Sequence, residues 1–130
     1  MIHVDVVTPT RKLVEGAKVS ELRLPSSEGE LQVLPGHTEL LTLLGTGILA
    51  FNQGGKERKF SVSLGFAEVR DDRVLVLAET CEESTDIDRE RAETAKNNAE
   101  GELTGVLTPE RFRKYELKLQ RAVTRIKISN

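Results

Sequence analysis

Tryptophan is absent from these 130 residues, and tyrosine and cysteine each occur only once. Aromatic residues make up 4% of the chain, so a hydrophobic core must be built mainly from valine, leucine and isoleucine. A single cysteine, Cys81, cannot close a disulfide within the chain, which favours an intracellular protein and a structural role for this thiol. No run of about 18 apolar residues is present, so the sequence predicts no membrane-spanning helix.

Histidine is also scarce, which limits the chemistry that the chain can carry out. His3 and His37 show no local arrangement with Cys81 or a serine that would mark a nucleophile and its base. They also lack the closely spaced ligand pairs of zinc sites. Glycine patterns of phosphate-binding and dinucleotide-binding loops are missing as well. The sequence therefore predicts a non-catalytic protein, without catalytic residues or a metal site.

Charge is distributed unevenly along the chain. Residues 109–130 contain seven basic and two acidic side chains, a net charge of +5, so residues 1–108 carry −7 within an overall charge of −2. An acidic body with a basic tail indicates that the tail meets an acidic surface on nucleic acid, anionic lipid or another protein. The simpler interpretation is a helix face in contact with solvent.

Residues 1–86 have the pattern of short β-strands. Apolar and polar residues alternate in residues 2–6, 21–24 and 60–64, which places Phe60, Val62 and Leu64 on one face. Turn residues recur at about the spacing of 8 to 12 residues that is typical of a sandwich or barrel, among them Gly54-Gly55 and Asp71-Asp72 in tight hairpins. The prediction is an antiparallel β-sandwich.

Helical periodicity replaces alternation after about residue 87. A first helix is predicted over residues 88–103, with Asp88 as its cap and a narrow alanine-rich face, and Gly105 ends it. Thr108 and Pro109 begin a second helix. The predicted fold is therefore α+β, with a β-sandwich domain over residues 1–86 and a two-helix hairpin over residues 87–130. The alanine-rich face buries little area, so weak docking of the hairpin is expected.

The most distinctive segment is residues 27–37, with the sequence Ser-Glu-Gly-Glu-Leu-Gln-Val-Leu-Pro-Gly-His. Its two glycines permit tight turns at both ends of a short strand, which puts Glu28 and Glu30 at one end and His37 at the other. Taken alone, the segment is typical of a hairpin with a polar, solvated tip.

Together with other motifs, this segment resembles the epsilon subunit of bacterial and chloroplast F-type ATP synthases. The other motifs are Val-Thr-Pro at 7–9, Leu-Gly-Phe-Ala-Glu-Val at 64–69, Val-Leu-Val-Leu-Ala-Glu at 74–79 and Ile-Asp-x-x-Arg-Ala at 87–92. Their order and spacing match over almost the whole chain. The resemblance implies a non-catalytic rotor subunit of the proton-translocating enzyme, in the central stalk.

In that family the sandwich packs against the gamma subunit and rests on the membrane-embedded ring of c subunits, so torque passes through this contact. Glu28, Gly29 and Glu30 resemble the loop that meets the polar loops of the c ring, and His37 is expected close to the same surface. Glu39 departs from the family, which commonly has proline two positions after this histidine. That difference concerns the local turn and not the fold.

The resemblance also implies a regulatory nucleotide, although no cofactor is required. In several bacterial members the Ile-Asp-x-x-Arg-Ala segment binds ATP, and Glu82, Ile87, Asp88, Arg91 and Ala92 match those positions. A guanidinium suits a phosphate, and a carboxylate can accept hydrogen bonds from the adenine or ribose. Asn98 stands where nucleotide-binding members carry a second basic residue, so weaker binding is expected. The alternative is that Asp88 only caps the helix and Arg91 is its ion-pair partner.

The second helix carries the regulatory expectation. In the family it can swing from the folded hairpin into the catalytic hexamer and oppose ATP hydrolysis, with its basic residues against an acidic segment of the beta subunit. The candidates here are Arg111, Arg113, Lys114, Lys118, Arg121 and Arg125.

The residues alone leave a second class of protein possible. It is a free-standing β-sandwich ligand-binding module whose basic tail binds nucleic acid or anionic lipid. The chain has no aromatic platform for base stacking, so a nucleic acid partner is not expected. The resemblance instead implies a peripheral protein on the cytoplasmic face of the bacterial inner membrane, or alternatively on the thylakoid membrane, held there only through its complex.

Overall fold

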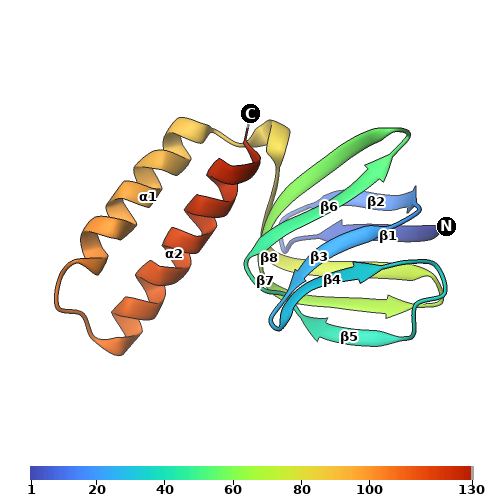
Figure 1. Ribbon diagram of the computed structural model, residues 1–130, viewed down its shortest axis with the longest axis horizontal. Coiled ribbons are helices and arrows are strands. Elements are labelled where there is room, and N and C mark those ends of the chain that lie inside the picture. Colours follow the sequence, from blue (N-terminus) through green and yellow to red (C-terminus); the bar gives the residue numbers. More distant parts are fainter. Residues whose placement is uncertain (130) are drawn as a thin grey trace.

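The computed structural model describes residues 1–129, which form a strand-rich body followed by two helices (Figure 1). The strands are β1 (Ile2–Val7), β2 (Lys12–Val19), β3 (Leu22–Ser26), β4 (Gly29–Val33), β5 (Leu40–Leu43), β6 (Gly47–Gln53), β7 (Lys56–Arg70) and β8 (Arg73–Glu83). A 3₁₀ turn, Ser84–Asp86, leads to the helices α1 (Arg89–Leu103) and α2 (Pro109–Ile128). The predicted α+β fold, strands first and helical hairpin second, is confirmed.

The long strand β7 joins the two layers of the sandwich. The hydrogen-bonded order is β2-β1-β8-β7-β6-β3-β4, and β5 is added on β7. Residues 56–62 of β7 pair with β6, whereas residues 66–69 pair with β5. Among the described strands, β1 runs parallel to β8 and the other pairs are antiparallel. The predicted antiparallel arrangement therefore has one parallel pairing, which joins the first strand of the body to the last.

Aliphatic side chains fill the space between the layers, as the composition predicts. Phe51 and Phe60 are the aromatic exceptions, and their rings stack with centroids 5.8 Å apart. The largest fully buried side chains come from both layers, so the layers share one core: Phe51, Phe60, Ile2, Leu22, Leu24, Leu49, Val4, Val6, Val19, Val33, Val62 and Val69.

The alternation predicted for residues 60–64 fails at Leu64. Phe60 and Val62 are fully buried as expected, but Leu64 is exposed, whereas Ser63 is buried. Leu64 and Gly65 both have positive φ, 60° and 117°, where β7 passes from β6 to β5. A Cβ on Gly65 would lie 1.9 Å from the carbonyl oxygen of Leu77, so only glycine fits there. The kink turns Leu64 outward, so the prediction that Leu64 shares a face with Phe60 and Val62 is wrong.

The helix boundaries follow from their caps. The Asp88 side chain accepts a hydrogen bond from the backbone N–H of Arg91, and the Thr108 side chain accepts one from that of Arg111. Both caps were predicted. The first helix ends at Leu103, as predicted, but Gly105 does not adopt the positive φ of a glycine cap. A tight turn closes the helix, with the N–H of Thr104 donating to the carbonyl of Gly101.

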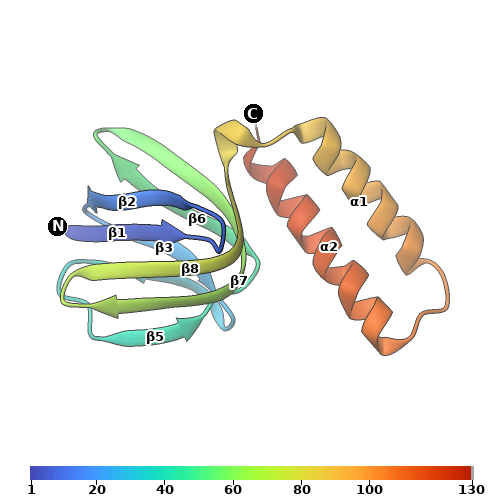
Figure 2. The ribbon, with the colours of Figure 1, turned by 180° about the vertical axis from the view of Figure 1, so that it is seen from behind.

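The helical hairpin touches the sandwich through α2. Both views place α2 between the sandwich and α1 (Figures 1 and 2), and α2 contacts β6 and β7. The helices pack on each other through small side chains, with Ala92, Ala99 and Ala122 buried. This packing brings the backbones close while it removes little apolar surface from water.

Candidate functional site

The β3–β4 loop forms a compact acidic tip. Ser26 Oγ donates to the carbonyl of Gly29 at 2.6 Å and accepts from the backbone N–H of Glu28 at 3.3 Å. Gly29 has φ of 122°, which favours glycine. Glu28 and Glu30 are exposed on either side of it. The structure therefore brings together Glu28, Gly29 and Glu30, the expected ring-facing residues.

His37 lies beyond the opposite end of β4. Its backbone N–H donates to the carbonyl of Leu34 at 3.1 Å, and the N–H of Gly36 donates to the Asp72 carboxylate at 2.8 Å. This places His37 near the β7–β8 turn, beyond the far end of β4 from Gly29, and the four residue steps of that strand span about 13 Å. The structure does not bring His37 beside Glu28 and Glu30, because an extended strand separates them.

The C-terminal half of α2 is held to the sandwich by two arginines. Arg125 Nε donates to Glu82 Oε1 at 2.8 Å, and Arg121 Nε donates to Ser63 Oγ at 3.1 Å. The side chains of both arginines are partly buried. Ser63 Oγ is also 2.8 Å from Thr46 Oγ1. In this arrangement Arg121 and Arg125 are used for docking the hairpin.

The N-terminal half of α2 presents its cations to solvent. Arg111, Lys114 and Lys118 surround the ring of Tyr115, at 5.8, 5.6 and 5.4 Å from its centroid. Arg111 also lies 3.9 Å from Glu102 of α1. Arg113 is exposed as well. The six basic candidates of the second helix thus divide into four exposed side chains and two that dock, a division that helical periodicity alone does not reveal.

The residues expected to bind nucleotide lie in two places. Glu82 is paired with Arg125, as described above. Asp88 caps α1 through the Arg91 backbone, and the side chains of Asp88 and Arg91 form no ion pair within residues 1–129. Ile87 is partly buried and Ala92 is fully buried. The cap interpretation is therefore confirmed, whereas the ion pair between Asp88 and Arg91 is absent.

A cavity of about 340 Å³ lies between α2 and strands β7 and β8. Glu82, Arg121 and Arg125 line it, together with Arg11 and Cys81. Burial raises the pKa of the Cys81 thiol to about 12, so the thiol is protonated and unreactive near neutral pH. The structural role predicted for Cys81 agrees with its packing against the core.

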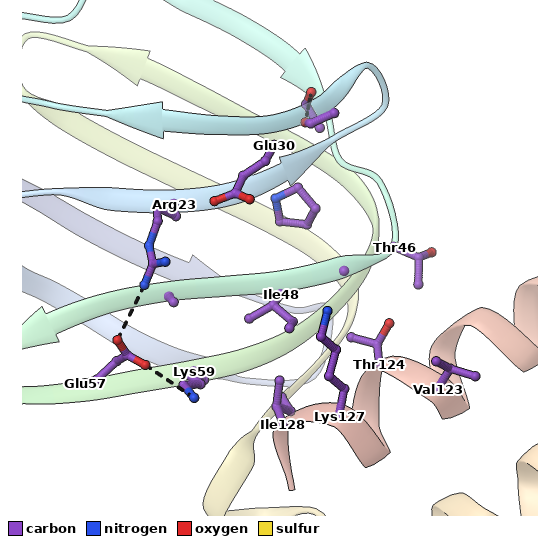
Figure 3. Close-up of a pocket in the computed structure, with 15 residues that line it drawn as sticks. Arg23, Glu30, Thr46, Ile48, Glu57, Lys59, Val123, Thr124, Lys127 and Ile128 are labelled. Carbon is purple, nitrogen blue, oxygen red and sulfur yellow. Dashed lines mark hydrogen bonds and ion pairs between the residues drawn. The ribbon is translucent and has the colours of Figure 1, made fainter.

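A larger cleft, of about 680 Å³, lies on the other side of α2 (Figure 3). Val123, Lys127 and Ile128 of α2 form one wall, and Ile48 and Glu30 lie on the sandwich side. Glu57 in the same cleft pairs with two cations, 3.5 Å from Arg23 and 3.4 Å from Lys59. The cleft is thus a mixed-charge gap between the hairpin end and the β3–β4 loop.

An apolar strip crosses the outer face of β5, β7 and β8. Leu43 lies opposite Phe66 and Phe66 opposite Leu77, so these side chains share one face. The most exposed members, hereafter the outer apolar strip, are Leu41 (68%), Leu43 (65%), Phe66 (38%) and Leu75 (37%). Sequence reasoning missed this strip, because alternating leucines resemble core positions until the pairing partners are known. Glu68 lies opposite both Leu41 and Leu75, so the strip is apolar throughout only in the row of Leu43, Phe66 and Leu77. An exposed apolar patch of this kind is typical of a protein interface.

Sequence reasoning also missed an ion pair just before the hairpin. Arg58 Nε and Nη2 donate to the two carboxylate oxygens of Glu83 at 2.9 Å each. The guanidinium lies 5.6 Å from the ring centroid of Phe51 and 5.2 Å from that of Phe60. Hydrogen bonding to Arg58 holds the pKa of the Glu83 carboxyl below its ordinary value. The contact fixes the end of β8, from which the hairpin departs.

Two family models match adjacent parts of the chain. The ATP synthase delta/epsilon chain β-sandwich domain matches residues 1–84, and the ATP synthase delta/epsilon chain long α-helix domain matches residues 85–130. This chain belongs to the ATP synthase delta/epsilon chain family. The family expected from the sequence is confirmed, and membership makes the chain one subunit of an enzyme complex.

Related proteins agree over nearly the full length. The ATP synthase epsilon chain of Citrifermentans bemidjiense is 42% identical over 130 residues, covering 98% of this chain and 93% of the relative. The ATP synthase epsilon chain of Desulforamulus reducens is 41% identical, and the match covers 96% of this chain and 94% of the relative. A chain in the mitochondrial ATP synthase of Euglena gracilis, determined as OSCP, F1 and c-ring, shares the fold with a TM-score of 0.83 at 24% identity, covering 95% of this chain and 78% of that one. A chain from the central stalk and c-ring of the Tetrahymena thermophila mitochondrial enzyme has a TM-score of 0.68 at 15% identity, with 99% and 96% covered.

Neither helix among residues 1–129 is long and apolar enough to cross a bilayer. No group of three or more histidine, cysteine, aspartate or glutamate side chains in this part of the chain is arranged to hold a metal ion.

Proposed function

We propose that the chain is a non-catalytic rotor subunit in the central stalk, where it couples the catalytic sector of the proton-translocating enzyme to the c ring. In this role the sandwich packs on the gamma subunit, and the acidic tip of Glu28, Gly29 and Glu30 meets polar loops of the c ring. The protein is then peripheral to the membrane and held there only through the complex, on the cytoplasmic face of a bacterial inner membrane or on a thylakoid membrane.

The observation that carries this proposal is the outer apolar strip. A subunit that works alone gains nothing from leaving Leu41, Leu43 and Phe66 in water, whereas a subunit of an assembly buries such a face against its neighbour. Aromatic and leucine side chains at the centre of an interface commonly carry much of its binding energy. The strip lies on the face of the sheet away from the core, where a partner can reach it.

A charge placed in the strip tests the proposal. We expect Phe66→Glu and Leu43→Glu each to weaken a one-to-one complex with purified gamma subunit by at least about tenfold, because the partner must then desolvate a carboxylate. Val106→Glu is the matched control, since Val106 is fully exposed in the turn between the helices. Absence of any association of the wild type at micromolar concentration would overturn the rotor role. Binding of Phe66→Glu as tight as wild type would place the interface elsewhere.

We also propose that the hairpin acts as a brake on ATP hydrolysis. The four exposed cations of α2 supply the charge that an acidic segment of the beta subunit requires, and release of Arg121 and Arg125 adds two more. Deletion of residues 105–130 is then expected to raise ATP hydrolysis by the assembled enzyme and to leave assembly intact. Unchanged hydrolysis would reject the brake.

For ATP, we propose a regulatory site that includes Glu82, Ile87, Asp88, Arg91 and Ala92. The support is chemical: Arg91 is exposed at the start of α1, where positive helix-end charge also favours phosphate. Calorimetry with ATP on the wild type and on Arg91→Ala decides the assignment. Equal heats from the two proteins would remove Arg91 from the site.

The exposed basic half of α2 is the one observation that favours a free-standing module with a basic tail. That module would bind DNA or anionic vesicles in a salt-dependent manner and would not bind gamma subunit. The gamma-binding measurement above, repeated with DNA and with vesicles, separates the two functions.

A further inference from the structure

Ser63 is a buried polar residue whose contacts extend in two directions. The residue is 1% exposed and lies between the sandwich and α2. Arg121 of α2 donates to its hydroxyl at 3.1 Å, and the Thr46 hydroxyl of the segment before β6 is 2.8 Å away. A serine hydroxyl has one donor and two acceptor positions, so these two contacts use most of its capacity.

Thr46 in turn belongs to a segment that carries the β3–β4 loop. The N–H of Ser27 donates to the carbonyl of Leu43 at 3.0 Å, and the N–H of Gly45 donates to the carbonyl of Pro25 at 3.1 Å. These bonds join the two segments one residue before and after the Ser26–Leu44 bridge. Ser26 itself closes the acidic tip through its hydroxyl.

The two segments lie too close together to move independently. A Cβ on Gly45 would lie 2.8 Å from the carbonyl oxygen of Ser26, and a Cβ on Gly47 would lie 2.9 Å from Cβ of Pro25. Thr46 stands between these two close approaches. A displacement of the loop base therefore moves the Thr46 hydroxyl, and with it the partner of Ser63.

Within residues 1–129, no hydrogen bond or ion pair joins the β3–β4 loop directly to α2. Glu30 and Lys127 line the same open cleft, yet they form no ion pair with each other in the described part of the chain (Figure 3). The cleft lies between the loop and the helix end, and the hydrogen bonds that connect the loop base to α2 pass through Thr46, Ser63 and Arg121.

We propose that Ser63 is a positioning residue that latches α2 onto the sandwich and links hairpin docking to the geometry of the β3–β4 loop. The inference rests on the proposed releasable hairpin. A partner that holds the loop in the present geometry keeps Thr46 against Ser63 and favours the docked hairpin. A partner that displaces the loop base withdraws Thr46 and favours release.

The test measures docking in the full chain, independently of hydrolysis. Energy transfer between dyes on Val106→Cys and Asn52→Cys, two exposed positions, in a Cys81→Ala background reports the ratio of undocked to docked molecules. We expect Ser63→Ala to raise this ratio about tenfold, because a hydrogen bond from a charged donor is lost. Ser61→Ala is the matched control: Ser61 lies on the same strand and lines the cavity beside α2, and its loss is expected to leave the ratio unchanged.

Coupling to the loop requires a double-mutant cycle. Ser26→Ala opens the acidic tip and is expected to raise the ratio severalfold in the wild type, but not further in Ser63→Ala. Arg121→Gln removes the partner of Ser63 on the helix and leaves the sandwich unchanged. In this background, Ser63→Ala is expected to cause no further rise in the ratio. Equal effects of Ser63→Ala and Ser61→Ala would overturn the latch. If the double variant raised the ratio by the product of the two single effects, the link to the loop would be overturned.

Failure of the brake has a different signature. If Ser63→Ala releases the hairpin in the energy-transfer measurement while hydrolysis by the assembled enzyme stays unchanged, the latch stands and the brake is rejected.

Discussion

The forces that stabilise the sandwich differ from those that hold the helical hairpin on it. The sandwich buries a continuous aliphatic core around the stacked rings of Phe51 and Phe60. The hairpin buries alanines between its helices and contacts the sandwich through an ion pair, a hydrogen bond to Ser63 and the end of α2 around Ile128. Apolar burial contributes roughly 25 cal/mol per Å², whereas partly exposed polar contacts contribute about 1 kcal/mol each.

This difference indicates which part can move. Separation of the sandwich layers would expose many large apolar side chains at once, so the body unfolds as a whole or not at all. Release of the hairpin breaks mainly polar contacts, whose partners can bond to water instead. The chain thus combines a body with a large apolar core and a hairpin docked mainly by polar contacts, so local opening is expected first at the hairpin.

The largest expected effect comes from the core of the body. Phe60→Ala is expected to lower the free energy of unfolding by about 3 to 5 kcal/mol, because a fully buried ring is replaced by a cavity. The half-exposed Phe112 of α2 is the matched control, and its change to alanine is expected to cost less than about 1 kcal/mol. Urea unfolding followed by circular dichroism measures both. Equal losses for the two variants would remove the contrast between body and arm.

Cys81 reports on the boundary between the two regions. With its pKa raised to about 12 by burial, the thiol is expected to react with iodoacetamide at pH 8 about a hundredfold or more slowly than in the urea-unfolded chain. Because the thiol lines the cavity under α2, deletion of residues 105–130 is expected to speed the reaction. Mass spectrometry of timed samples gives the rates. A deletion that leaves the rate unchanged would mean that the hairpin does not shield this cavity.

The Arg58–Glu83 pair tests the end of the body from which the arm departs. Because hydrogen bonds from Arg58 lower the folded-state pKa of Glu83, the pair stabilises the fold above the ordinary carboxyl pKa, and this contribution is lost as pH falls through the lowered value. Arg58→Met is expected to lose about 1 to 2 kcal/mol at pH 7. The difference from wild type is expected to narrow below about pH 4, because Glu83 becomes protonated in both proteins. An undiminished difference at pH 3 in thermal unfolding curves would contradict this account.

The smallest effect is expected at the ion pair that docks the arm. Arg125→Gln weakens the contact with Glu82 and is expected to increase hydrogen exchange of α2 amides about fivefold, equivalent to about 1 kcal/mol, while the melting temperature of the sandwich stays constant. Arg113→Gln, an exposed neighbour on the same helix, serves as the control and is expected to change neither quantity. Equal exchange in both variants would show that the ion pair does not hold the helix.

Local sequence patterns predicted what depends on local chemistry. Alternation predicted that Phe60 and Val62 face the core, and the caps Asp88 and Thr108 located both helix starts, because a cap acts on amides within its own turn. The parallel pairing of β1 with β8 joins residues about seventy positions apart and leaves no local signal. The prediction for Leu64 was wrong because the positive φ of this residue, next to Gly65, reverses the direction of its side chain.

The candidate site was predictable to a smaller extent. The acidic tip at Glu28 and Glu30 followed from the turn residues, but its separation from His37 is a matter of distance along β4. The family resemblance named the basic residues of α2 as one group of candidates. Which of them dock depends on where Ser63 and Glu82 lie on the sandwich, so Arg121 and Arg125 could not be told apart from Arg111 or Lys118.

Native-state hydrogen exchange of the full chain tests the separable arm most directly. Amides of α1 and α2 are expected to exchange through an opening that costs several kcal/mol less than global unfolding and depends little on urea, whereas amides of β7 and β8 exchange only through global unfolding. If the helices and the core strands instead opened together, with one free energy and one urea dependence, the hairpin would be an integral part of the body.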